Sequence, residues 1–263
     1  MAGRYDAGVT PHRPPSGHRT PPADRSGRQG PSRAPREAPP GGSGARGRAV
    51  PRAAGGTGLP GWLSEELARV TPRRSVPAAA AELEEAVAAF VGGRYAKARR
   101  HAEEAKALAP RLPAIREVLG LSAYRMGRWE QALSDLRTYR RLSGDTTHLP
   151  VEMDILRALE RPAEVEAAYS LLRRLGGSPA ALAEGRVVYG SYLLDCDRAR
   201  EAWALTRPAN LKARPAEEEL RVWYVAARAA ARLGDRPGSR RLYQAIAEAD
   251  PGFPGLDELE AAL

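Results

Sequence analysis

The sequence predicts an all-α fold in which paired helices repeat along the chain, and three observations predict it. Apolar residues recur at three- and four-residue steps through residues 113–145, which is the period of one helix face. Gly127 divides that stretch into two helices, at a point where a tight turn needs a positive φ. The pattern around Gly127 returns 34 residues earlier, at Gly93, and 107 residues later, at Gly234.

The stretch 113–145 predicts two amphipathic helices packed face to face. Gly120 and Ala132 are small enough to let the two backbones approach closely, and Trp129 and Leu136 would fill the space beside them. We therefore expect Leu136 to be buried. The apolar positions of the two helices are Ile115, Val118, Leu119, Leu121 and Tyr124, then Trp129, Ala132, Leu133, Leu136, Tyr139 and Leu142.

Five such units are predicted, with a short helix over 257–263 as a cap on the last. The third and fourth units lack the turn glycine, and Pro162 and Asp197 are predicted to occupy its place. The fourth unit has a second helix cut short by Pro208. The predicted units are residues 79–112, 113–145, 148–181, 183–209 and 220–254.

The order and spacing of Leu119-Gly120, Tyr124, Gly127, Trp129, Ala132 and Leu136 resemble a tetratricopeptide repeat. The resemblance extends over residues 79–254. It implies a right-handed α-solenoid of about five helix-turn-helix repeats, in which the first helix of each repeat lines a concave groove. Residues 116–162 also resemble a family of such proteins from high-GC Gram-positive (actinobacterial) bacteria. Its members join an Arg/Gly/Pro-rich leader to a short repeat domain, and the resemblance implies no biochemical activity.

Residues 1–60 form a tail with a composition unlike the rest. It holds ten arginines against three acidic residues, a net charge of +7, together with eleven prolines, twelve glycines and Tyr5 as the one aromatic residue. Such a segment buries too little apolar surface to offset its ordering entropy, so disorder is predicted. Three roles stay open: a solvated leader, weak attraction to RNA or another polyanion, and proline-rich docking to a partner.

Residues 61–78 are predicted to be a short helix and a linker. We expect Ser64 to cap the helix and Trp62, Leu63 and Leu67 to dock on the first repeat as a lid, because repeat arrays need their end faces covered. A loosely held flap is the alternative.

Composition bounds the cellular setting. Cys196 is the single cysteine among 263 residues, so no intrachain disulfide can form, and a reducing, cytoplasmic location is expected. Neither a membrane-spanning apolar run nor the apolar core of a secretory signal is present in the sequence, so membrane association is not expected.

The motifs of catalysis are not found. The four histidines, His12, His18, His101 and His148, lack a second ligand at metal spacing, and acidic neighbours disfavour the thiolate of Cys196. His148 is predicted to begin a helix, and His101 to lie on a solvated face. The sequence therefore predicts a non-enzyme without metal or cofactor that binds a protein or peptide partner.

Two surfaces are candidate binding sites. The first helices would present a mixed apolar and basic groove, suited to an extended or helical acidic peptide. Packing between repeats is the alternative role for Leu121 and Tyr124. The second helices would carry a stripe of arginines that could bind a polyanion, with ordinary solvated arginines as the alternative. The groove candidates are Val87, Phe90, Glu117, Leu121, Tyr124, Arg125, Ser191, Tyr224, Arg228 and Arg232, and the stripe candidates are Arg99, Arg100, Arg137, Arg140 and Arg141.

The connection at 205–217 is predicted to be the weakest joint of the array. Fewer apolar residues there mean a smaller buried interface, so the fifth repeat would hinge on this segment. The alternative is that Trp203 and Trp223 pack together and lock the joint.

Overall fold

The structure is a computed structural model that describes residues 58–262. Within this range the chain consists of helices and turns, without strands. The predicted disorder of the tail concerns residues that lie almost wholly outside this range. The helices are α1 (Gly61–Val70), a 3₁₀ turn η1 (Arg73–Ser75), α2 (Val76–Val91), α3 (Tyr95–Leu108), α4 (Pro113–Arg125), α5 (Trp129–Ser143), α6 (Leu149–Ala158), α7 (Pro162–Leu175), α8 (Pro179–Asp195), α9 (Ala199–Thr206), α10 (Glu217–Arg232), α11 (Arg236–Ala249) and α12 (Leu256–Ala261).

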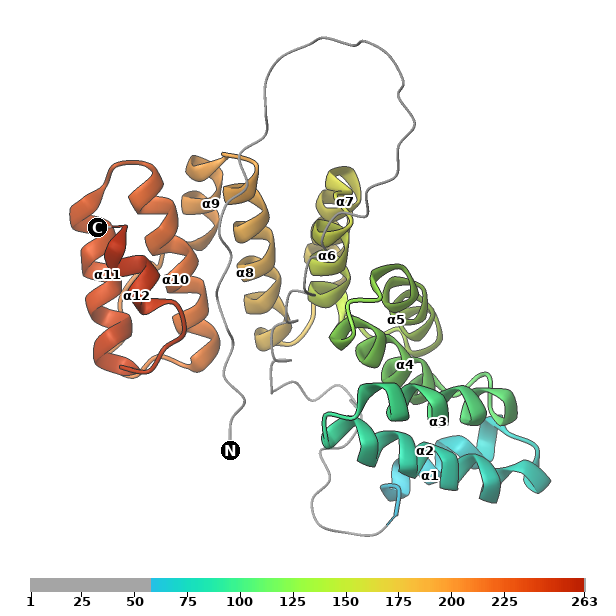
Figure 1. The fold of residues 1–263 in the computed structure, drawn as a ribbon. Helices are drawn as coiled ribbons and strands as arrows, with labels where there is room; N and C mark the ends of the chain where they lie inside the picture. The colour runs from blue at the N-terminus through green and yellow to red at the C-terminus, as the bar shows by residue number, and fades with distance from the viewer. Residues whose placement is uncertain (1–57, 263) are drawn as a thin grey trace, which may run out of the picture.

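Five helical hairpins make up most of the described chain, and they coincide with the five predicted units. The pairs are α2–α3, α4–α5, α6–α7, α8–α9 and α10–α11 (Figure 1). The first helix of the fourth pair begins at Pro179, before the predicted start of that unit at residue 183. Six of the described helices have proline at the first or second position. An N–H there would have no partner within the helix, so proline, which lacks an N–H, loses no hydrogen bond. These helices are α2, α4, α6, α7, α8 and α11.

One turn geometry closes all five hairpins. A residue with positive φ follows each first helix, at intervals of 33 to 37 residues: Gly93, Gly127, Glu160, Asp197 and Gly234. The N–H of the next residue donates to the carbonyl five residues before it, at 2.8–3.0 Å, and the positive-φ residue donates to the carbonyl three before it, at 3.0–3.2 Å. This pair of bonds satisfies the last carbonyls of the helix in the Schellman manner.

The prediction that Pro162 takes the place of the turn glycine was wrong. Glu160 holds the left-handed position with φ 56°, and Pro162 is the first residue of α7. Proline cannot adopt a positive φ, since its ring fixes φ near −65°. The prediction for Asp197 was correct, with φ 59°.

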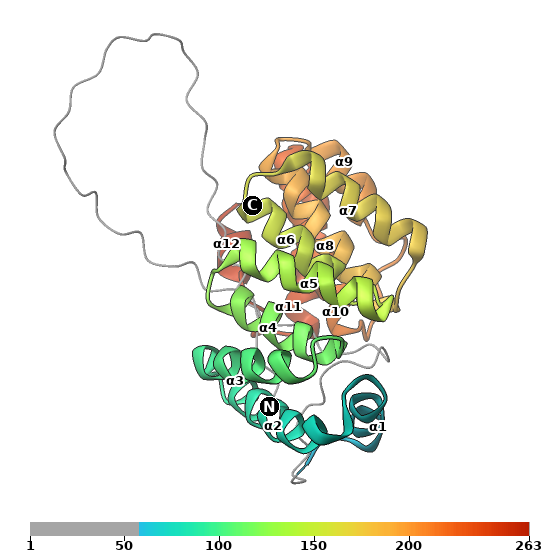
Figure 2. The ribbon, with the colours of Figure 1, turned by 90° about the vertical axis from the view of Figure 1, so that its right-hand side faces the viewer.

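The hairpins stack in chain order (Figures 1 and 2). Each second helix packs on the first helix of the next pair, and contacts also join α2 to α4, α6 to α8 and α8 to α10. The buried apolar residues form three clusters instead of one core: the first from α1 to α4, the second from α4 to α10, and the third from α10 to α12. Helices α4 and α10 each contribute to two clusters and therefore join them.

Close backbone approach inside the second hairpin confirms the predicted role of Gly120. A Cβ at Gly120 would lie 2.7 Å from both Cγ and Cδ2 of Leu136 and 3.2 Å from its backbone nitrogen. Leu136 is fully buried, as predicted. The space that glycine leaves on α4 is thus occupied by a leucine of α5.

Short helices cover both ends of the array. Leu63 and Leu67 of α1 are fully buried in the first cluster, and Trp62 packs against it, so the predicted docking is confirmed. The prediction that Ser64 caps this helix was wrong. The helix begins at Gly61 after Pro60, whose carbonyl accepts from the N–H of Ser64 at 3.0 Å. At the other end Leu256 and Leu259 of α12 are buried against α10 and α11.

Candidate binding surfaces

The first-helix candidates divide into buried and accessible residues. Val87, Glu117, Tyr124 and Tyr224 are buried and therefore serve mainly the interior. Leu121 packs against the second cluster and Phe90 against the first. The side chains that solvent reaches are those of Phe90, Leu121, Arg125, Ser191 and Arg228, which are half-buried, and Arg232, which is exposed.

Aromatic residues support the accessible arginines of the first helices. The guanidinium of Arg125 lies 5.5 Å from the centre of the Tyr95 ring, which meets Phe90 edge to face. Arg228 lies 5.8 Å from the centre of the Tyr224 ring. A guanidinium over an aromatic face gains cation–π energy. These contacts hold the two arginines in defined positions on the first-helix surface.

A buried polar cluster explains why Glu117 does not line a groove. Its carboxylate is 1% exposed and contacts Nε2 of His148, 2.7 Å away. The His148 ring lies 5.1 Å from that of Tyr139, whose hydroxyl donates to Asp145 at 3.1 Å. Burial and the charges of Glu117 and Asp145 raise the pKa of Tyr139 above its usual range. His148 precedes α6, as predicted, but its pairing across 31 residues had no signal in the sequence.

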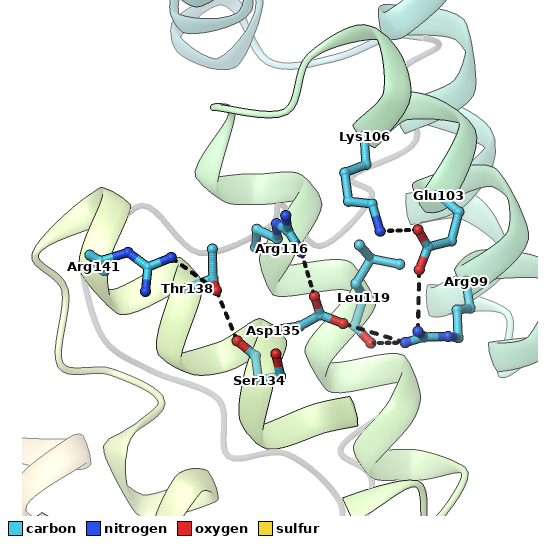
Figure 3. Close-up of polar contacts among 9 residues, drawn as sticks. All are labelled: Arg99, Glu103, Lys106, Arg116, Leu119, Ser134, Asp135, Thr138 and Arg141. Atoms are coloured by element: carbon cyan, nitrogen blue, oxygen red, sulfur yellow. Dashed lines mark hydrogen bonds and ion pairs between the residues drawn. The ribbon is translucent and has the colours of Figure 1, made fainter. Parts of the chain in front are cut away.

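Buried carboxylates engage three of the five stripe arginines. Figure 3 shows Asp135, which is 6% exposed, accepting from Arg99 at 3.5 Å and from Arg116 at 2.8 Å. Glu152, 2% exposed, accepts two bonds from Arg140, at 3.0 and 3.2 Å.

Arg137 reaches toward Glu152 and bonds to Glu164 at 2.7 Å, which holds the pKa of Glu164 below its usual range. Arg99, Arg137 and Arg140 therefore link neighbouring hairpins. Their charges are largely compensated within the chain.

Arg100 and Arg141 are exposed, and neither forms an ion pair among the described residues. Arg141 donates to the Thr138 hydroxyl at 3.3 Å (Figure 3). Arg100 contacts the ring of His101 at 3.2 Å. His101 itself is largely buried and contacts Glu82 at 2.7 Å, so the prediction that it lies on a solvated face was wrong. Glu82 of α2 and Arg100 of α3 both contact its ring.

Two adjoining cavities lie over α3, α4 and α5. The first, of about 270 Å³, is here called the α3–α5 hollow, and it is lined by Ala96, Arg99, Arg100, Glu103, Met126 and Arg128. The second, of about 370 Å³, shares Arg99 and Glu103 with it and extends along α5 past Glu130 and Asp135. Figure 3 shows the two shared residues, with Glu103 bonded to both Arg99 and Lys106.

Met126 and Arg128 were not among the predicted site residues. Both lie in the turn between α4 and α5, which the sequence marked only as a turn. A signal was present nonetheless, because an arginine follows the positive-φ residue in four of the five hairpins: Arg94, Arg128, Arg161 and Arg198.

The described part of the chain contains no group of three or more His, Cys, Asp and Glu side chains placed to hold a metal ion. Cys196 is exposed at the end of α8. Between residues 58 and 262 no helix has the length and apolar character needed to cross a membrane. Searches against protein-family models and against curated proteins found no match, so the site is interpreted from its residues alone.

Proposed function

We propose that the chain is a non-enzymatic interaction scaffold of the tetratricopeptide-repeat type, a right-handed α-solenoid that binds a protein or peptide partner. The observation that carries the proposal is the recurrence of one turn, with the same two hydrogen bonds, in five hairpins stacked in chain order. Arrays of this kind build extended surfaces from repeated units.

The first-helix surface is the proposed place of binding. It offers apolar Phe90 and Leu121 with Arg125 on the first two hairpins, and Arg228 and Arg232 on the fifth, a combination suited to an extended or helical acidic segment. The stacking of Arg125 and Arg228 on tyrosine rings supports this role, because a pre-positioned guanidinium loses less entropy when it binds a carboxylate. A reducing, cytoplasmic setting belongs to the same proposal and rests on the single cysteine.

An affinity capture tests the proposal. Tagged full-length chain and a chain lacking residues 1–57 are incubated with nuclease-treated lysate, and the captured proteins are identified by mass spectrometry. We expect one protein to be retained by both chains. Charge reversal of Arg125 and Arg228 to glutamate should release it, whereas Arg241→Glu, an exposed change on α11, should not. Equal capture by both variants would show that the first-helix surface is not the binding site.

Nucleic-acid association through residues 1–60 is the second candidate function, and the +7 charge of that segment favours it. The paired state of Arg99, Arg137 and Arg140 favours the tail over the stripe as the place of such binding. Binding to single-stranded RNA should fall steeply with salt and be lost on deletion of residues 1–57. Salt-independent binding, or binding retained after the deletion, would contradict this candidate.

A further inference from the structure

An ion pair joins the turn arginine of the third hairpin, and that of the fourth, to the hairpin before it. Arg161 Nη2 lies 2.6 Å from Glu130 Oε1, and Arg198 Nη1 lies 2.6 Å from Glu166 Oε1. The two partners are 31 and 32 residues apart, respectively. In both cases the glutamate comes from the second helix of the hairpin before, so the bond connects adjacent units.

The first and second hairpins lack this bond. Arg128 is the turn arginine of the second hairpin, and the residue of α3 that corresponds to Glu130, three after the positive-φ residue Gly93, is Ala96. Both residues line the α3–α5 hollow. Among the described ion pairs none includes Arg128, and none includes Arg100, which lines the same hollow. A methyl group therefore stands on α3 at the position where α5 carries Glu130.

Among the described residues, the lining of the hollow includes one carboxylate. Glu103, the one acidic residue of the hollow, already bonds to Arg99 and Lys106. Ala96 and Met126 add apolar surface beside the two unpaired arginines. Guanidinium groups bind carboxylates through parallel hydrogen bonds, and Arg100 and Arg128 have donors left for such bonds.

The geometry points to the α3–α5 hollow as the site for one acidic side chain of a protein partner, with an apolar residue next to it against Met126. The partner's carboxylate would pair with Arg128 as Glu130 pairs with Arg161. This inference rests on the proposed scaffold function and adds a second contact region away from the first helices. A single carboxylate suits the hollow better than a run of phosphates, because Glu103 lines the hollow and Glu130 lines the adjoining cavity.

Methyl NMR of the full-length chain gives a direct readout. The chain has three methionines, of which Met126 lines the hollow and Met153 is fully buried in the second cluster. The probe is a pool of short peptides that combine Asp or Glu with apolar residues, and the control pool carries Asn or Gln instead. We expect the acidic pool to shift the Met126 methyl signal saturably, the amide pool to leave it unchanged, and Met153 to be unaffected by either.

Substitutions at the hollow then decide the assignment. Ala96→Glu should supply the carboxylate from within the chain. The affinity for the acidic peptides should then fall by about tenfold or more, the effect of losing one charge-assisted hydrogen bond. Ala96→Gln is the matched control and should have little effect. The pair Arg100→Gln and Arg128→Gln should also weaken binding by about tenfold or more, whereas Arg141→Gln with Arg200→Gln, an equal change of charge at exposed positions elsewhere, should not.

Several outcomes would overturn the inference. These are a Met126 signal that neither pool moves, equal shifts from both pools, or Ala96→Glu binding like the original chain. A shift produced by single-stranded poly(U) and removed by the Arg100 and Arg128 substitutions would assign the hollow to nucleic acid. The scaffold proposal is judged separately, since its capture experiment depends on Arg125 and Arg228.

Discussion

Replacing Gly120 by alanine tests whether the close approach of α4 and α5 determines the stability of the second hairpin. The new Cβ would lie 2.7 Å from two side-chain carbons of Leu136. Real Cβ atoms essentially never approach another heavy atom so closely, so something must shift. Leu136 is fully buried, and its backbone nitrogen would also lie 3.2 Å from the new Cβ. The substitution therefore sets overpacking against the better helix propensity of alanine.

The effect of Gly120→Ala on stability should change sign when Leu136 is replaced by alanine. Overpacking a core costs about 1–3 kcal/mol, and alanine in mid-helix gains about 1 kcal/mol over glycine, so Gly120→Ala should lower the free energy of unfolding by about 0–2 kcal/mol. Leu136→Ala alone should lower it by about 2–5 kcal/mol, through lost burial and a cavity. In the Leu136→Ala background the two clashing carbons are absent, and Gly120→Ala should then raise stability by about 1 kcal/mol.

Urea unfolding followed by circular dichroism measures all four members of this double-mutant cycle. A coupling free energy of about 1–3 kcal/mol between the two positions is expected, as for residues in contact. Gly61→Ala is the control, because a Cβ there meets nothing within 4 Å. A stabilising Gly120→Ala in the original background, or additive effects, would refute the packing argument.

Three further predictions concern turns, protonation and local opening. Glu160→Gly and Asp197→Gly should each raise the free energy of unfolding by about 1 kcal/mol, because a left-handed φ is strained for both residues and unstrained for glycine. Unchanged urea midpoints would contradict this. Burial raises the pKa of Tyr139 above its usual range and that of Tyr192 to about 12. The folded chain therefore retains protons that the unfolded chain loses above about pH 10, so the free energy of unfolding should fall as pH rises from about 10 to 12. Urea midpoints across that range test it, and an unchanged midpoint would count against it. Residues 205–217 should exchange their amide hydrogens faster than α5; protection equal to that of α5 would rule out a hinge there and favour the locked joint.

The repeated units were predictable because their signals are local. A turn glycine, an apolar face and a helix-starting proline each act within one or two turns of the chain, so the five hairpins could be placed from the sequence. Glu160 was missed because a charged residue with a positive φ has no composition cue, and Pro162 beside it drew attention instead. Ser64 was assigned as a cap because the helix start at Pro60 and Gly61 lacks the usual polar residue.

The binding surfaces were less predictable because they depend on contacts between hairpins. An exposed stripe of arginines and a set of arginines bound to Asp135 and Glu152 look alike in one sequence, since the buried acids lie on other helices. The pairing of Glu117 with His148 is equally non-local. The recurrence of arginine after the turn was visible, but its meaning required the distance from Arg161 to Glu130.

The three apolar clusters follow one another along the chain, and this order bears on how the chain folds during synthesis. The first cluster is complete once α4 has been made, because its buried members all lie between Leu63 and Leu119. The ribosome adds residues slowly compared with helix formation, and contacts close in sequence form quickly. The N-terminal hairpin and its α1 lid can therefore be folded while α10 to α12 are still unmade. Each later hairpin then packs on the hairpin before it, which is already folded. During synthesis the folded part of the chain therefore exposes apolar surface only where the next hairpin will pack.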